Sequence, residues 1–270
     1  MEETILFVEI FQPFAQYRNP FTFYYAQTYP LPPKSTIIGM LQNACNDWYG
    51  NNQEKDWEGL KVSIHGGFES IFWNYQNLIK GETKFNENMQ LVNQRLPLYA
   101  EGLTSQRSPV SQQELFNGHL FIFLKNESDF IKRLADVLER PNKILYLGRS
   151  EDIAFIRKVK EVESKEISVE GDIKLTYPTY ILLEGFPLKN KKYPVYSIPI
   201  KNTFQNKGQK VKHKGEITKG TERKVEFATT IYTGNDYSVI LDENSGPIKV
   251  DEIMMIEDKT IRIINPYGWL

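Results

Sequence analysis

The sequence predicts an α+β protein with two parts. Residues 1–158 are expected to form a ferredoxin-like, RNA-recognition-like domain of order β-α-β-β-α-β, with a β-arm inserted at about residues 66–114. Residues 159–270 are expected to form a small antiparallel β domain. Three observations lead to this prediction: the order of segments in the first half, a long interval between two neighbouring strands, and a series of short apolar runs in the second half.

Six segments of the first half give the order of the fold. The first strand is apolar on nearly both faces, as a central strand is, and the next two are half-buried strands. The two helices carry apolar residues at helical spacing; Ser35 or Thr36 is expected to cap the first, and Pro141 ends the second. In chain order the segments are residues 4–11 (strand), 35–48 (helix), 60–65 (strand), 115–125 (strand), 128–138 (helix) and 144–147 (strand).

Two features extend this minimal fold. The interval between His65 and Leu115 is far longer than a hairpin turn, and its strand-like pieces at 70–75 and 89–99 predict a protruding β-arm. From Ile167 onward, short apolar runs are separated by Gly, Asn, Pro and Asp, a pattern typical of an antiparallel β module. These runs are residues 179–183, 195–200, 227–232, 239–241, 253–256 and 261–264.

The composition excludes several classes of protein. The chain has 270 residues, 40% of them hydrophobic, a net charge of −1 and one cysteine, Cys45. The aromatic content and low net charge exclude disorder, and a lone cysteine excludes a disulfide framework. No apolar run approaches the roughly 20 residues of a membrane helix, and the first residues lack the basic start of a signal peptide. A cytoplasmic protein without a membrane partner is expected.

Charge is distributed unevenly along the chain. Between Lys189 and Lys224 there are eleven Lys or Arg residues and two acidic residues. This stretch is also poor in apolar residues, so residues at about 201–224 are expected to form a mobile loop or a long hairpin arm. Two interpretations stay open: a solvated basic loop, or an arm that contacts the phosphates of a polyanion.

The sequence lacks the motifs of several enzyme classes. It contains no P-loop, no dinucleotide-binding fingerprint, no zinc-protease helix motif and no nucleophile elbow of an α/β-hydrolase. Acidic pairs at 242–243, 251–252 and 257–258 lie beside turns or strand ends, where exposed charge explains them better than metal ligation does. No metal and no cofactor is expected.

Two short segments have the composition of anion sites. The residues from Tyr29 to Met40 place prolines, Lys34, Ser35 and Thr36 at a helix N-terminus, where free amides and the helix dipole favour an anion. A plain helix cap with prolines that fix the approach of the chain explains the same residues equally well. The second segment, Leu-Gly-Arg-Ser-Glu-Asp at 147–152, turns from a strand into a basic loop; its arginine either contacts an anion or pairs with a neighbouring carboxylate.

These two segments carry a family resemblance. The run Tyr-Arg-Asn-Pro-Phe-Thr-Phe at 17–23, the run Thr-Tyr-Pro-Leu-Pro-Pro-Lys-Ser-Thr-Ile-Ile-Gly-Met-Leu at 28–41 and the turn at 147–152 resemble the "Cas five" family of CRISPR-associated proteins. These proteins belong to the RAMP superfamily and cap the 5′ handle of the guide RNA in CRISPR Cascade complexes. The match resembles the subtype I-B branch, and the predicted element order extends the likeness over the whole chain.

The resemblance implies a non-catalytic, RNA-binding function. The implied partners are the 5′ handle of the crRNA, the Cascade backbone subunit, the large subunit and, through the assembled complex, target DNA. Tyr17 is expected to stack on a base, and the motif residues and basic loop to contact RNA phosphates. The expected RNA-binding residues are Tyr17, Arg18, Lys34, Ser35, Thr36, Arg107, Gly148, Arg149, Ser150, Lys210, Lys212 and Lys214.

Two alternatives stay open. One branch of the resembled family cleaves the repeat transcript without a metal, and the residues suited to that chemistry at neutral pH are His65, His119 and His213. The first two are more often structural at strand ends, and the third lies in the basic loop, which holds a catalytic group poorly. The second alternative is a related subunit of a type III effector complex.

Overall fold

The computed structural model describes residues 3–22, 25–47, 54–80, 106–189, 192–213, 216–234, 238–242, 245–254 and 260–270. Its main sheet has the strand order β3-β4-β1-β5, antiparallel throughout, with the short β2 added parallel to β4. The elements of this part are β1 (Glu3–Ala15), β2 (Tyr25–Ala26), α1 (Lys34–Ala44), α2 (Glu54–Gly59), β3 (Lys61–Lys80), β4 (Gln106–Glu127), α3 (Ser128–Glu139) and β5 (Phe155–Val162).

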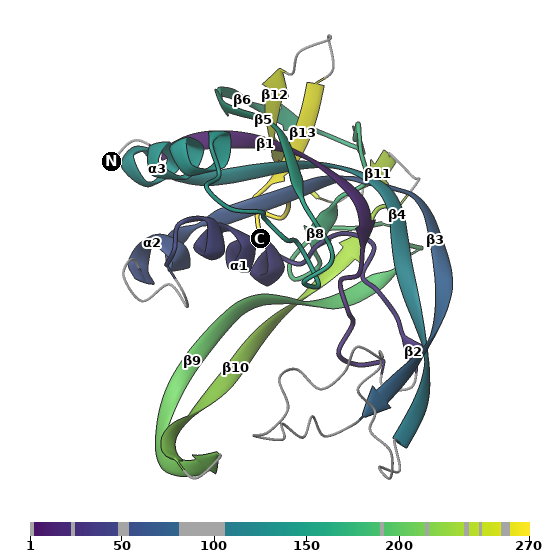
Figure 1. Ribbon diagram of the computed structural model, residues 1–270. Helices are drawn as coiled ribbons and strands as arrows, with labels where there is room; N and C mark the ends of the chain where they lie inside the picture. Colours follow the sequence, from purple (N-terminus) through teal and green to yellow (C-terminus); the bar gives the residue numbers. More distant parts are fainter. Residues whose placement is uncertain are drawn as a thin grey trace.

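Both faces of the main sheet are covered around the first half of β1 (Figure 1). On one face, Leu6, Val8 and Ile10 of β1 belong to a core cluster that includes residues of α1 and α3. On the other face, Ile5 and Phe7 pack with residues of the last strands of the chain. The alternation along β1 explains why its sequence is apolar at nearly every position, because a strand buried on two faces has no solvent side.

The fourth predicted strand is wrong in position. Residues 144–147 form only an isolated bridge, Tyr146 with Ile153, in a tight turn, and the strand beside β1 is β5. Leu145 and Leu147 are buried in this turn, which gives the apolar alternation of a strand without a strand. Half of the β5 sequence, Phe-Ile-Arg-Lys-Val-Lys-Glu-Val, is charged, because β5 lies at the sheet edge, where half of its residues are exposed to solvent.

The predicted β-arm is confirmed as a long hairpin. Pairing of β3 with β4 continues without a break from Ser70 opposite Phe116 to Lys80 opposite Gln106. The strand-like piece expected at 89–99 lies outside the described residues. Arg107 lies opposite Ile79 near the far end of the pairing.

The second half of the chain is antiparallel β, as expected, and its strands form three small sheets. The sheet orders are β8-β10-β9, β11-β7 and β13-β12-β6. The boundary expected at 158 falls inside β5, and the division into two domains stays a prediction. The strands are β6 (Ser164–Val169), β7 (Asp172–Lys174), β8 (Tyr180–Leu182), β9 (Val195–His213), β10 (Glu216–Tyr232), β11 (Ser238–Ile240), β12 (Ile248–Met254) and β13 (Thr260–Asn265).

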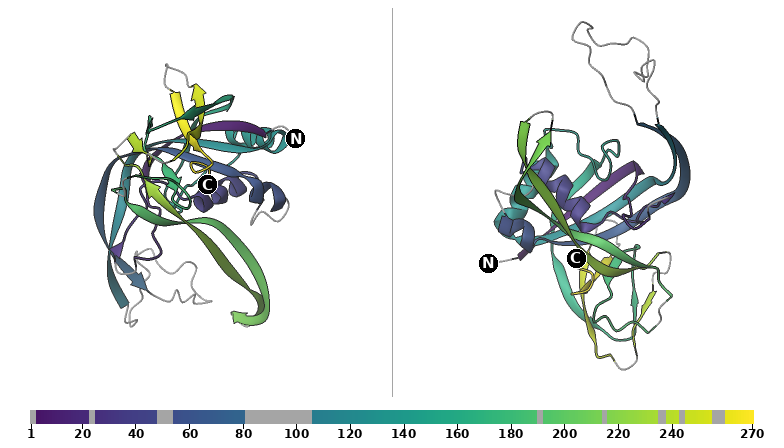
Figure 2. Two further views of the ribbon diagram at one scale, coloured as in Figure 1. Left: turned by 180° about the vertical axis from the view of Figure 1, so that it is seen from behind. Right: turned by 90° about the horizontal axis from the view of Figure 1, so that it is seen from below.

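The basic segment is a long hairpin. Register pairs of β9 with β10 run from Val195 opposite Ile231 to His213 opposite Glu216, with two irregularities along the way. Both this hairpin and the β3/β4 hairpin project to the same side of the molecule, and Figure 2 shows them from two further directions. Of the two forms expected for residues 201–224, the hairpin arm is therefore the observed one. Among the described residues, no helix has the length and apolar character needed to cross a bilayer.

Candidate functional site

The first anion candidate is the N-terminus of α1. The helix begins at Lys34 with Pro33 in the capping position, and no side chain caps it. The amides of Thr36 and Ile37 donate to the Pro33 carbonyl oxygen, at 3.0 and 3.2 Å. The expectation that Ser35 or Thr36 caps the helix is therefore wrong, because the capping position is Pro33, two residues before Ser35, which places the buried Ser35 inside the first turn.

Lys34 binds within the protein. Its Nζ donates to the backbone oxygen of Leu270 at 2.9 Å, and Leu270 in turn exchanges two backbone hydrogen bonds with Val62 of β3. Burial, and second the nearby charge of Lys201, lower the pKa of Lys34 to about 8. Since Lys201 lies on β9, the start of α1 and the root of the basic hairpin are close together.

The proline-rich segment before α1 connects to the second half of the chain. The Tyr29 hydroxyl donates to the Ser197 carbonyl oxygen at 2.6 Å, and burial raises the pKa of Tyr29 to about 12. The Tyr180 hydroxyl donates to the Leu31 carbonyl oxygen at 2.8 Å and accepts from the Leu31 amide at 3.2 Å. These contacts hold the root of the β9/β10 hairpin beside α1.

Tyr17, which the sequence predicts to stack on a base, lies in the core of the protein. Only 2% of its surface is exposed, and its hydroxyl donates to the side-chain oxygen of Gln12. A buried ring has no face free for a base, and this argues against stacking by Tyr17. The neighbouring Arg18 is exposed, and its backbone bridges to Thr28.

The turn at 147–152 is built on a glycine. Gly148 has a φ of +120°, where a Cβ atom would lie 2.7 Å from Asp152 Oδ2 and 2.9 Å from the Gln16 carbonyl oxygen. Both the backbone angle and the lack of space require glycine here.

Gly148→Ala is expected to lower the free energy of unfolding by about 2–4 kcal/mol, from the strained φ and the close contact with Asp152. Urea unfolding monitored by circular dichroism measures the change. Gly171→Ala is the matched control, since Gly171 has a φ of +75° but no atom within 4 Å of the place that a Cβ would take. An equal loss in both variants would contradict a contribution from the close contact.

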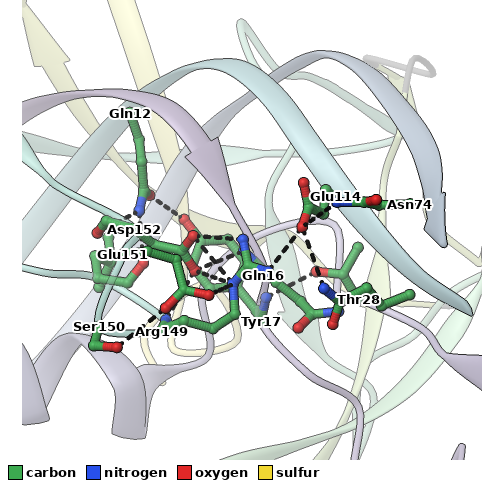
Figure 3. A network of polar contacts seen from close by, with 12 residues as sticks. Gln12, Gln16, Tyr17, Thr28, Asn74, Glu114, Arg149, Ser150, Glu151 and Asp152 are labelled. Atoms are coloured by element: carbon green, nitrogen blue, oxygen red, sulfur yellow. Dashed lines mark hydrogen bonds and ion pairs between the residues drawn. The ribbon is translucent and has the colours of Figure 1, made fainter. Parts of the chain in front are cut away.

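Asp152 is the centre of a polar network (Figure 3). Its side chain is fully buried and accepts hydrogen bonds from the backbone amides of Gln16 and Arg149, at 3.0 and 2.8 Å. It also accepts from the Arg149 guanidinium at 2.8 Å. One carboxylate thus holds two backbone amides and a guanidinium together in the turn.

The Arg149 guanidinium joins this turn to the β3/β4 hairpin. It contacts Asp152 and Glu114 at 2.8 Å each, and the more exposed Glu151 at 3.3 Å. Burial disfavours its charge, but the hydrogen bonds and charges of Asp152 and Glu114 prevail and raise the pKa of Arg149. Glu114, on β4, also accepts from Asn74 of β3 at 3.2 Å.

The pairing interpretation of Arg149 is therefore the observed one, and the expected phosphate contact stays a prediction. Three carboxylates surround a single guanidinium, so the turn has a surplus of negative charge. Ser150 is exposed and its hydroxyl donates to Glu151 at 3.1 Å. The geometry makes Arg149 a positioning residue for the hairpin.

Sequence reasoning missed the buried polar residues that hold the turn. The Gln12 side-chain amide donates to the Leu147 carbonyl oxygen at 2.6 Å. The Gln16 side-chain amide donates to the Gln113 carbonyl oxygen at 3.0 Å. In the sequence, these residues stand out only as polar residues near the end of an apolar strand. An exposed glutamine gives the same signal, so the pattern alone cannot find them.

The other predicted residues lie on the hairpins. Lys210 and Lys212 are on β9, opposite Lys219 and Ile217. Lys214 lies outside the described residues, and the structure describes the backbone of Arg107 but not its side chain. The roots of both hairpins, the start of α1 and the 147–152 turn thus meet in one region, while the predicted lysines lie further out along β9.

The three histidines have different environments. His65 is 2% exposed, shares a hydrogen bond of 3.0 Å with the Ser63 hydroxyl, and has a pKa lowered by burial to about 3. His119 is exposed on β4, and the backbone of His213 ends β9. Within the described ranges, no group of three or more His, Cys, Asp or Glu side chains is placed to hold a metal ion.

Comparison with solved structures finds CRISPR proteins at low identity. A structure described as "CRISPR RNA-guided surveillance complex" is 15% identical, with 87% of this chain and 95% of that chain covered and a TM-score of 0.43. A CRISPR protein from Archaeoglobus fulgidus is 13% identical, with 96% and 98% covered and a TM-score of 0.39. A chain of the type III-B Cmr-beta complex bound to cognate target RNA and AMPPnP is 15% identical, with 88% and 86% covered and a TM-score of 0.39.

The sequence comparisons identify the family. No curated protein sequence matches the chain. The family model Cas_Cas5d, described as "CRISPR-associated protein (Cas_Cas5)", matches residues 5–213, which is well over half of the chain and includes both motif segments and the whole of β9. The chain belongs to this Cas5 family of CRISPR-associated proteins.

Proposed function

We propose that this chain is a non-catalytic, RNA-binding subunit of a type I CRISPR Cascade surveillance complex in the cytoplasm. It holds the 5′ handle of the crRNA and bridges the backbone and large subunits, and it meets target DNA through the assembled complex. Family membership supports the proposal. The β-α-β-β-α-β succession and the antiparallel order β3-β4-β1-β5 support a ferredoxin-like first domain.

The observation that carries the proposal is the basic β9/β10 hairpin rooted beside the start of α1. The stretch from Lys189 to Lys224 has nine more basic than acidic residues, counted as eleven against two. Three of the eleven precede β9, and between Val195 and Lys224 eight basic residues face two acidic ones. Such an excess on one projecting element attracts a polyanion through counterion release and steers its approach. The tyrosine contacts of Tyr29 and Tyr180 fix the root, so the charge is presented from a defined place.

The structure supports different roles for several of the residues that the sequence predicts to bind RNA. Arg18, which is exposed, and the lysines of β9 are the phosphate-contacting residues of the proposal. Lys34 and Arg149 act inside the protein instead, since Lys34 binds Leu270 and Arg149 binds carboxylates. Their effect on RNA is through the placement of α1 and of the β3/β4 hairpin.

Replacing Lys210, Lys212 and Lys214 together with alanine is expected to weaken RNA capture at least tenfold. The slope of log K against log salt is expected to fall by about 2, at roughly 0.7 for each phosphate contact with a single strand. Fluorescence anisotropy with an RNA that carries the repeat-derived 5′ end, over a salt series, measures both.

The matched control replaces three exposed lysines outside the hairpin, namely Lys132, Lys165 and Lys174. This control removes the same net charge and is expected to keep the salt slope. An unchanged slope in the hairpin variant, or an equal loss in the control, would contradict the assignment of the hairpin.

We also propose that the chain does not cleave RNA. General acid–base catalysis needs a group that titrates near the working pH within reach of the ribose 2′-OH. His65 is buried with a pKa of about 3, which argues against it as that group. Repeat RNA incubated with the protein and a chelator is expected to stay intact for hours. Cleavage at one phosphate that is lost in His119→Ala or His213→Ala would overturn this proposal.

A further inference from the structure

A row of aromatic rings crosses the main sheet away from the hairpin roots. His119, Phe11 and Phe155 are neighbours in register on β4, β1 and β5. The ring centroids of Phe11 and His119 are 5.2 Å apart, and those of Phe11 and Phe155 are 6.2 Å apart. Phe155 is 44% exposed and His119 is also exposed, so the row has a surface open to solvent.

Positive charge borders this row. The Arg157 guanidinium lies over the Phe11 ring at 5.1 Å and over the Phe155 ring at 5.9 Å. A register shift between β1 and β5 follows next, and beyond it Lys158 and Lys160 lie opposite Glu9 and Phe7 of β1. Because the register shift leaves Arg157 as an extra residue in β5, both lysines lie on the same face as Phe155, opposite the odd-numbered residues of β1.

Among the residues that the structure describes, the three cations beside the aromatic row have no acidic partner. There, no acidic side chain comes within ion-pair distance of Arg157, Lys158 or Lys160. Glu9 lies opposite Lys158, so three cations face one acid in register. The same stretch of β5 lines one wall of a surface depression of about 670 Å³, and the segment from 138 to 145, which includes both Glu139 and Arg140, lines the other.

The sheet face is divided between this patch and the C-terminal strands. Ile5 and Phe7, at the start of β1, pack with Ile261 and Trp269. Phe11 lies further along β1, where its ring contacts are with His119, Phe155 and Arg157. The patch is therefore formed by β4, β1 and β5 alone, and it shares no residue with α1 or with the β9/β10 hairpin.

We propose that Phe11, His119, Phe155, Arg157, Lys158 and Lys160 form a second binding site, specific for single-stranded nucleic acid. Bases stack on the aromatic row and phosphates pair with the three cations, the combination by which proteins bind single strands without reading sequence. This goes beyond the proposed function, which places the crRNA handle at the hairpins. The site takes a strand that passes along β5.

A protein strand is a poorer occupant of this edge. Added strands pair with a regular edge through the backbone, whereas lysines and a bulge are features that block such pairing, and β5 has both. An acidic peptide would match the charge but not the row of stacked rings. Stackable bases joined by phosphates match both.

The test is photocrosslinking of the full chain to 12-nucleotide oligo(U) RNA or oligo(dT) DNA with a central 5-iodouracil base. Mass spectrometry locates the adducts, and their yield against oligonucleotide concentration gives a half-saturating concentration for each peptide. We expect adducts on the segments that contain Phe11 and Phe155. Phe155→Ala and Arg157→Ala are each expected to raise the half-saturating concentration there about tenfold. The matched controls Ile240→Ala and Lys174→Ala are expected to leave it unchanged.

The outcomes separate this site from the hairpin site. The triple lysine variant of β9 is expected to lose adducts at residues 201–224 and keep those at Phe155. Adducts on the hairpin but none on the Phe11 and Phe155 segments would overturn the second site and leave the proposed function intact. Competition by poly-glutamate as effective as that by oligo(dT) of equal charge would also overturn it, in favour of an acidic protein partner. Saturation by RNA alone, by DNA alone or by both supports the site and identifies the source of the strand.

Discussion

Asp152→Ala is expected to lower the free energy of unfolding by about 3–5 kcal/mol, which is the usual cost of removing one partner of a buried ion pair. The Asp152 side chain is fully buried and satisfies the amides of Gln16 and Arg149 in addition to the guanidinium. Without it, two buried N–H groups lose their acceptor, and Arg149 keeps only the partners Glu114 and Glu151.

Glu151→Ala is the matched control for this prediction. Glu151 pairs with the same guanidinium, but its side chain is 61% exposed, and an exposed pair is worth about 1 kcal/mol or less. Urea unfolding of both variants under the same conditions measures the difference. A loss in Asp152→Ala no larger than that in Glu151→Ala would contradict the central position of Asp152.

Acid is expected to destabilise the protein through His65. Burial lowers the pKa of His65 to about 3, below its ordinary value near 6.5, so between these values the unfolded chain binds a proton that the folded protein excludes. Stability therefore falls as the pH falls through this window, at about 1.4 kcal/mol per pH unit, or about 2 kcal/mol between pH 7 and pH 5.

Unfolding at a series of pH values isolates this contribution. His65→Gln keeps a group that can bond to the Ser63 hydroxyl but does not titrate, so its stability is expected to fall less steeply between pH 7 and pH 5. The comparison is of slopes, and a lower stability of the variant at pH 7 does not affect it. His119→Gln is the control with an exposed side chain. A slope in His65→Gln equal to that of the unchanged protein would show that His65 is not the titrating group.

The sequence predicts the elements of this protein better than its contacts. The strand at 4–11, the helices beginning near 35 and 128 and the strand at 115–125 all lie within or against observed elements, because their periodicity reflects which face is buried. The error at 144–147 has the same origin. Burial of Leu145 and Leu147 in a turn produces strand-like alternation. The edge strand β5 has charged residues at half of its positions, so its sequence lacks the apolar pattern by which a strand is identified.

The candidate site shows a different limit. Residue types at 147–152 identify an arginine in a glycine turn, but whether the arginine meets a phosphate or a carboxylate depends on Glu114, which comes from a strand 35 residues away along the chain. Tyr17 likewise lies in a motif rich in aromatic residues, and only tertiary packing decides that its ring is buried. Composition indicates the chemistry of a segment, and the contacts made at a distance decide how that chemistry is used.

The surplus negative charge of the 147–152 turn also restricts the path of a bound strand. One guanidinium is surrounded by the carboxylates of Glu114, Glu151 and Asp152, of which Glu151 is largely exposed. Repulsion from such a cluster extends about 8 Å at physiological salt. Under the proposed function, an RNA backbone between the hairpins would be repelled from the 147–152 turn toward the lysines of β9. The turn that holds the β3/β4 hairpin would then also set the direction of the strand.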